Sequence, residues 1–326
     1  MPLRRTIVLS LFALLVAATC RQPESQPAAS PKPATLTDDL GRLIARPPHI
    51  ARIVTLAPNL TEMVYALGSG AKLVGTDDFS DFPAEAKKVA KVGGMQPNVE
   101  MITALHPDLV LATTQGNQPS LAPALAAANV PLFVVRSDRL EQIPKAMARL
   151  AELLDSPNRD AVSRLRDALA RQRRTRAKRP RILFAVWTNP IYVAGRDNFD
   201  DDLLTLCGGE NVVAVPGWPQ YSLESLVADP PDVILYPNHS VTRAAIDALL
   251  QKGVKSEAVA VSESVFTRPG PRVAEAAEAL NAILDGLAAR QTQHAATDQR
   301  PAAIGAQSLP RSSDHSQPTS RAAHPS

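Results

Sequence analysis

Short apolar runs rich in valine, isoleucine and leucine recur along the middle of the chain, separated by segments long enough for helices. The runs lie at 52–57, 72–76, 108–113 and 131–136 in the first half and at 181–187, 232–237 and 258–262 in the second half. Continuous apolar runs that alternate with helical segments are typical of parallel strands covered by helices. The pattern predicts an α/β protein with two lobes, each built on a mostly parallel sheet.

The two halves share an internal repeat. The stretch "NVEMITALHPDLVLA", which begins at Asn98, aligns without a gap to "SLESLVADPPDVILY", which begins at Ser222. In both copies the first residue is a good helix cap, a glutamate (Glu100 or Glu224) takes the second helical position, and Pro-Asp ends the helix before a strand. Two similar lobes that face one another predict a ligand cleft between them.

A helical segment, 137–180, separates the halves. Apolar residues line one helical face before a break at Pro157 and again after it. A helical crossover resists bending more than a pair of strands does. We therefore expect an N-terminal lobe at 48–136 and a C-terminal lobe at 181–289 joined by a long, rigid α-helical connector, with limited hinge closure.

Both ends of the chain differ in composition from its middle. Residues 1–20 contain two arginines, an apolar run too short to span a bilayer, and then Cys20, which is the layout of a secretory signal. Cys20 stands where a lipoprotein signal places its acylated cysteine, and plain cleavage nearby is the alternative. Polar composition predicts a flexible tether at 21–47 and a disordered tail at 290–326. The protein is expected in the periplasm or at the cell surface, anchored to the membrane by lipid.

Composition excludes several kinds of partner and site. The 326 residues include 35 basic and 32 acidic side chains, a net charge of +3, so no nucleic-acid partner is expected. The basic run 171–181 is interpreted as a solvated helix end, with an electrostatic patch as the alternative. Cys207 has no intrachain partner once the signal is removed, and the six histidines lack metal-ligand spacing. We expect a buried thiol and no metal site.

Enzymatic motifs are missing from the sequence. It contains no G-x-S-x-G elbow, no phosphate-binding glycine loop and no H-E-x-x-H. The acidic triplet 200–202 follows Asn198 and is interpreted as the first turn of a helix, where carboxylates favour the helix dipole, in preference to a cation site. No catalytic residue or cofactor is expected. A sensor domain on the same fold would need a transmembrane helix, so a binding protein is the favoured interpretation.

The stretch "RIVTLAPNLTEMVYALG" takes the chain from a strand directly into a helix. Asn59 is a candidate cap for a helix that begins at Leu60, with Glu62 completing a capping box. The apolar residues of this helix form a stripe expected to be buried, namely Leu60, Met63, Val64 and Leu67. The end of a strand next to a helix start is also where open α/β sheets place ligands. Sequence alone leaves ordinary capping and a ligand edge equally supported.

Five stretches carry a family resemblance: "RIVTLAPNLTEMVYALG", "LVGTDDFSDFPAEAKKVAKVGG", "NVEMITALHPDLVLA", "GGENVV" and "WPQYSLESLVADPPDVIL". Together they resemble the periplasmic cobalamin-binding proteins of ABC importers, in a class that also includes ferric siderophore and haem binders. The resemblance covers nearly all of residues 50–287. It implies two Rossmann-like lobes and a monomer that captures cobalamin or another corrinoid and delivers it to a permease dimer. A ferric siderophore or haem ligand is the alternative.

The expected ligand contacts are Pro58, Asn59, Phe79 and Met95 in the first lobe and Trp187, Trp218 and Arg268 in the second. The resemblance implies that Pro58 and Phe79 touch the corrin, whereas Met95 stands where cobalamin binders often have tryptophan. The two tryptophans could each bury roughly 150 to 250 Å² against a ring system. The alternatives are core packing for both tryptophans and loop capping for Arg268.

Glu100 and Glu224 are expected to be a docking pair. The resemblance implies that the matching glutamates contact arginines of the two permease subunits. The alternative is that each carboxylate only interacts favourably with the dipole of its own helix.

Overall fold

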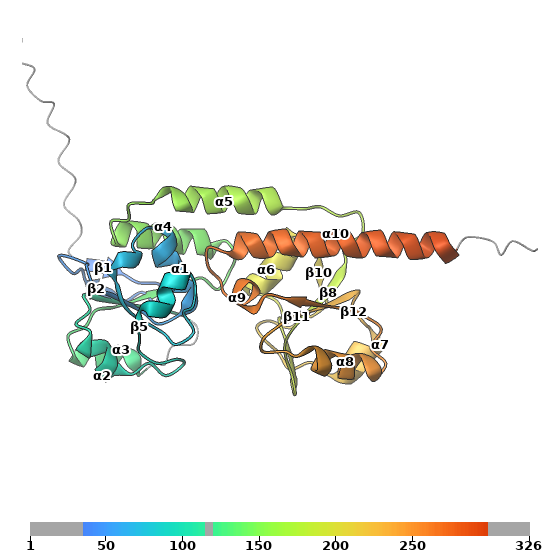
Figure 1. Ribbon diagram of the computed structural model, residues 1–326, viewed down its shortest axis with the longest axis horizontal. Helices are drawn as coiled ribbons and strands as arrows, with labels where there is room; N and C mark the ends of the chain where they lie inside the picture. The colour runs from blue at the N-terminus through green and yellow to red at the C-terminus, as the bar shows by residue number, and fades with distance from the viewer. Residues whose placement is uncertain (1–34, 115–119, 299–326) are drawn as a thin grey trace, which may run out of the picture.

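The computed structural model describes residues 35–114 and 120–298, which form two α/β lobes side by side (Figure 1). The sheet of the first lobe has the strand order β5-β4-β3-β6-β7, and every pairing in it is parallel. Its strands are β3 (Ile53–Thr55), β4 (Leu73–Thr76), β5 (Ala90–Lys91), β6 (Leu109–Thr113) and β7 (Leu132–Val135). Its helices are α1 (Pro58–Ala66), α2 (Val99–Ala104) and α3 (Leu121–Ala127), with the 3-10 turns η1 (Gly70–Lys72) and η2 (Ala84–Lys88).

The second lobe repeats this plan. Its sheet has the order β10-β8-β11-β12, all parallel, with β9 added antiparallel to β8. The strands are β8 (Arg181–Thr188), β9 (Ile191–Val193), β10 (Glu210–Asn211), β11 (Val233–Pro237) and β12 (Glu257–Val261). The helices are α6 (Phe199–Leu206), α7 (Leu223–Ala228), α8 (Arg243–Gln251) and α9 (Glu263–Phe266). The predicted α/β class with two mostly parallel sheets is confirmed.

The connector consists of two helices, α4 (Gln142–Leu153) and α5 (Asp160–Gln172), with a turn between them. The C-terminal helix α10 (Val273–Asp298) packs along α5, so two long helices run along one edge of the molecule (Figure 1). Asn281 of α10 strengthens this contact, because its Nδ2 donates to the carbonyl of Gln172 at 2.8 Å. The crossover is therefore braced by a second helix.

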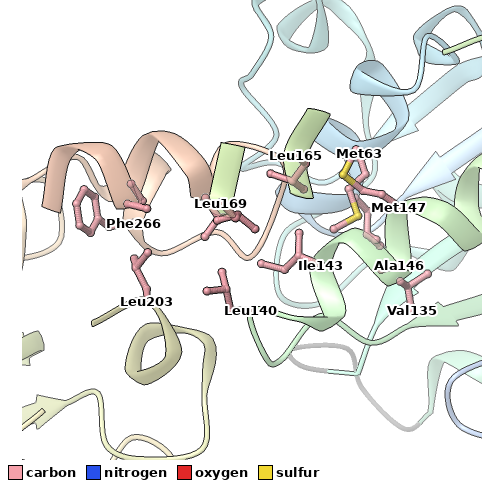
Figure 2. Close-up of a cluster of buried hydrophobic side chains, with 14 of the residues drawn as sticks. Met63, Val135, Leu140, Ile143, Ala146, Met147, Leu165, Leu169, Leu203 and Phe266 are labelled. Carbon is pink, nitrogen blue, oxygen red and sulfur yellow. The ribbon is translucent and has the colours of Figure 1, made fainter. Parts of the chain in front are cut away.

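One apolar core continues from lobe to lobe through the connector. Met63 of α1 lies beside Met147 of α4 in the first lobe, whereas Leu203 and Phe266 belong to the second (Figure 2). Leu169 of α5 belongs to the same cluster and lies between the first-lobe methionines and these second-lobe side chains. A large hinge motion would expose this apolar surface to water, which is unfavourable.

The expected boundaries of the flexible ends are wrong in part. Within the predicted tether 21–47, strands β1 (Thr35–Thr37) and β2 (Leu43–Ala45) form a hairpin. Asp38 is buried in its turn and accepts hydrogen bonds from the backbone and guanidinium of Arg42, which hold its pKa below the usual range despite the opposing effect of burial. Arg149 of α4 ion-pairs with Asp39 and attaches the hairpin to the lobe. At the other end, α10 continues to Asp298, into the predicted tail.

Cys207 is buried at the end of α6, as expected. Its Sγ donates to the carbonyl of Ala277 at 3.4 Å, and burial raises the pKa of the thiol to about 12. The residue is a small core side chain and not a nucleophile.

Candidate functional site

The first lobe forms a pocket where its central strand β3 leads into α1. Pro58 takes the first helical position, where its missing N–H costs nothing, and Ala57 precedes it without a side-chain cap. The predicted cap at Asn59 is wrong, because Asn59 lies inside the helix. Its Nδ2 instead donates to Ser137 Oγ at 3.1 Å and to the carbonyl of Pro269 at 3.3 Å. Asn59 thus connects the two lobes at the edge of the pocket.

All four ligand contacts expected in the first lobe line this pocket, which has a volume of about 190 Å³. Phe79 and Met95 are apolar but 54% and 64% exposed, so both present surface for a ligand to cover. Pro269 of the second lobe closes one side of it. The remaining lining residues are Leu56, Ala57, Asp77, Gly94, Thr113, Ser137 and Asp138.

A buried polar network holds the loop that carries Phe79. Asp77 accepts hydrogen bonds from the Phe79 backbone N–H at 2.8 Å and from the Ser80 hydroxyl. The hydroxyls of Ser80, Thr61 and Thr55 continue the chain, with oxygen separations of 2.7 and 2.6 Å. Burial raises the pKa of Asp77. This network was not predicted from the sequence, although the short polar run between β4 and η2 is a signal for it.

Glu62 is the centre of an ion cluster between the lobes and not part of a capping box. Its side chain is 1% exposed, and Arg272 at the start of α10 donates to both carboxylate oxygens at 2.9 and 2.7 Å. The Arg272 guanidinium also stacks on the Phe82 ring, 4.1 Å from its centroid. A buried carboxylate needs such a partner because an isolated charge is costly to remove from water.

Arg268 joins the same cluster. Its guanidinium donates to Glu62 at 3.1 Å, to Asp81 at 2.7 Å and to the Phe79 carbonyl at 3.1 Å. Arg268 was expected to contact the ligand, and the structure places it next to Phe79. Its guanidinium donors are bonded to residues of the first lobe, so Arg268 holds the Phe79 loop against the second lobe.

The two tryptophans of the second lobe are partly exposed and do not line the first-lobe pocket. Trp187, at the end of β8, is 49% exposed, and its Nε1 donates to the carbonyl of Asn189 at 3.0 Å. Trp218 is 40% exposed and lies beside Asp200 of α6. Burial raises the pKa of Asp200 to about 8, which favours a neutral carboxyl beside the indole. Neither ring is a fully buried core residue, so both offer aromatic surface.

Glu100 and Glu224 occupy matching positions on the two lobes. Each is the second residue of its helix, α2 or α7, and the expected caps are present: Asn98 accepts from the backbone N–H of Met101, and Ser222 from that of Ser225, both at 3.0 Å. Both glutamates are exposed. Helices α2 and α7 lie along the edge of the molecule opposite α5 and α10 (Figure 1).

Three other expectations concern sites away from the pocket. Cys20 lies outside the described residues. Within residues 35–114 and 120–298, no group of three histidine, cysteine or acidic side chains is arranged to hold a metal ion. The acidic triplet 200–202 lies in the first turn of α6, which Asn198 caps, as the sequence predicted. Over those same ranges, no helix combines the length and apolarity that crossing a membrane requires.

Comparisons with known proteins agree with this architecture. The chain matches the periplasmic binding protein family over residues 53–264. It is 31% identical to a vitamin B12-binding protein of Pectobacterium carotovorum over 72% of this chain and 89% of that protein. Among solved structures, the periplasmic vitamin B12-binding protein of Vibrio cholerae superposes with a TM-score of 0.59 at 27% identity, covering 73% and 98% of the two chains.

A periplasmic haem-binding protein from Pseudomonas aeruginosa has a TM-score of 0.64 at 26% identity, covering 72% and 92% of the two chains. All of these relatives are named for binding, which agrees with the interpretation as a binding protein. With a family match across most of its length and two lobes built on mostly parallel sheets, the chain belongs to the periplasmic binding protein family.

Proposed function

We propose that this protein captures cobalamin or a related corrinoid outside the cytoplasm and delivers it to the permease of an ABC importer. The observation that carries the proposal is the exposed apolar surface of Phe79 and Met95 in a pocket at the end of β3. A corrin is broad and largely apolar, and such a ring system gains most from flat contacts of this kind. Relatives named vitamin B12-binding proteins, alignable over most of the chain, support the same ligand class.

Haem or a ferric siderophore is the second candidate, supported by the likeness to a haem-binding protein. Proteins that bind haem usually supply an axial ligand such as histidine, tyrosine, cysteine or methionine. Among the described lining residues of the first-lobe pocket, only Met95 offers such an atom. The described lining of the pocket thus offers one thioether and no histidine, tyrosine or cysteine, which favours a corrinoid whose cobalt carries its own ligands.

The test is titration with cyanocobalamin, followed by tryptophan emission and by isothermal titration calorimetry. Trp187 and Trp218 are the two tryptophans of the chain, so each single Trp→Phe variant reports on one ring. We expect saturable quenching with a Kd between about 1 nM and about 1 μM. Met95→Ala should weaken binding, whereas Met101→Ala, which changes an exposed methionine outside the pocket, should not.

Two results would reject the corrinoid. One is the absence of both quenching and heat at tens of micromolar cyanocobalamin. The other is a response to haemin or to a ferric siderophore with none to cyanocobalamin, which would establish the second candidate.

Glu100 and Glu224 are the proposed contacts with the permease. Their matched places on α2 and α7 suit a twofold partner, and each has an exposed apolar neighbour, Met101 or Val227. Ion pairs at a rim contribute typically under about 1 kcal/mol each, but they fix orientation. We propose in addition that Cys20 carries a lipid that holds the carrier at the membrane.

A further inference from the structure

Positive charge is locally concentrated in one strip of the protein. Residues 159–181, from the start of α5 to the start of β8, contain ten basic and two acidic side chains. The rest of the chain contains 25 basic and 30 acidic side chains. The small net charge of +3 is therefore the sum of a strongly positive strip and a negatively charged remainder of the chain. A helix C-terminus accounts only for the cations in the last turn of α5.

Most of these cations lack a carboxylate partner in the described part of the chain. Arg176 pairs with Asp285 and Arg181 with Asp229. Three cations donate to neutral amide or carbonyl oxygens, which leaves their charge uncompensated: Arg164, Arg174 and Arg179. Among the described contacts, no salt bridge involves the other five, which are Arg159, Arg166, Arg171, Arg173 and Lys178.

A groove of about 730 Å³ lies beside the strip, between α4, α5 and α6. Arg166 of α5 and Arg173, which directly follows this helix, both line it. Arg139 lines it too, but its guanidinium is held by Asp202 at 2.8 and 2.6 Å. The floor of the groove is apolar and formed by nearly buried leucines, namely Leu140, Leu169 and Leu206. An apolar floor flanked by unpaired guanidinium groups suits an amphipathic anion.

We propose that this basic face, made of α5, residues 171–179 and the groove, binds the surface of a bilayer that contains anionic phospholipid. Guanidinium groups bind phosphate in bidentate geometry, and the leucine floor accommodates apolar parts of the lipid. Each cation close to an anionic bilayer increases partitioning about fivefold. The face lies opposite α2 and α7 (Figure 1), so a bilayer-bound protein keeps Glu100 and Glu224 accessible. The proposal does not depend on which ligand is carried.

Vesicle co-sedimentation of the full chain tests the proposal. Vesicles of phosphatidylcholine with roughly a third phosphatidylglycerol are compared with pure phosphatidylcholine, so that any acyl chain on the protein contributes equally to both. The test variant is Arg166→Gln/Arg171→Gln/Arg173→Gln. The control variant, Lys88→Gln/Lys252→Gln/Lys255→Gln, loses the same charge from exposed positions outside the strip.

We expect preferential binding to the anionic vesicles, reduced on the order of 100-fold in the test variant and little changed in the control. Raising salt from about 0.1 M to about 1 M, which shortens the Debye length to roughly 3 Å, should abolish the preference. Equal binding to both vesicle types, or equal losses in the two variants, would overturn the proposal. Retention on heparin without binding to anionic vesicles would also overturn it, because it would assign the face to a soluble polyanion.

Discussion

The ion cluster at Glu62 leads to a prediction about stability. Glu62→Gln keeps the shape of the side chain but removes the negative charge that the guanidinium groups of Arg272 and Arg268 share. The Glu62 and Arg272 side chains are 1% and 10% exposed, so solvent cannot compensate for the lost partner. Breaking a buried pair by removing one partner costs about 3 to 5 kcal/mol. In this variant Arg268 keeps its ion pair with Asp81, so only Arg272 loses its carboxylate partner. We therefore expect a loss of unfolding free energy near the lower end of that range.

The assay is urea denaturation with linear extrapolation of the free energy of unfolding. Arg272→Met should cost a similar amount, because it leaves the Glu62 carboxylate without its bidentate partner. The double variant should cost clearly less than the two single losses together, since it removes both members of the pair. Arg243→Gln is the control, because its pair with Asp247 is exposed to solvent and should contribute little to stability. A loss below about 1 kcal/mol for Glu62→Gln, or strict additivity, would refute this account of the cluster.

Three further predictions concern the docking pair, a buried acid and the buried thiol. Glu100→Ala/Glu224→Ala should leave ligand affinity and Tm nearly unchanged while sharply reducing uptake by the reconstituted importer; unchanged uptake would leave both glutamates with only a helix-dipole role. The pKa of Asp200 is raised to about 8 in the folded protein, so the folded state holds a proton that the unfolded state releases near pH 4. Its contribution to stability should fall as pH rises from about 4 to about 8 and then level off, and Asp200→Asn should flatten the curve of unfolding free energy in that window. Cys207, with its pKa raised to about 12, should resist a thiol reagent at pH 8 until urea unfolds the protein, and rapid labelling of the native protein would contradict its burial.

Local sequence patterns determined much of the fold. Alternating apolar runs predicted the two parallel sheets, because a strand covered by helices on both faces must be apolar along its length. The caps at Asn98, Ser222 and Asn198 were readable because each bonds a backbone N–H three residues ahead. The buried stripe of α1 followed from helical periodicity alone, as in the case of Met63. These features depend on neighbours in the chain, which a sequence displays directly.

The same local rules failed where tertiary partners were stronger. The sequence pattern predicted that Asn59 and Glu62 form a capping box. In the structure, Asn59 instead donates to Ser137 and Pro269. Glu62 accepts from Arg272, which is 210 positions away. The hairpin within the expected tether was missed for a related reason, since it depends on the ion pair of Asp39 with Arg149 in α4. In an exposed first turn, a polar side chain can hydrogen-bond to the free backbone N–H groups of its own helix. Once folding buries that turn between two lobes, its charge requires a counter-charge, and only the tertiary structure decides which residue supplies it.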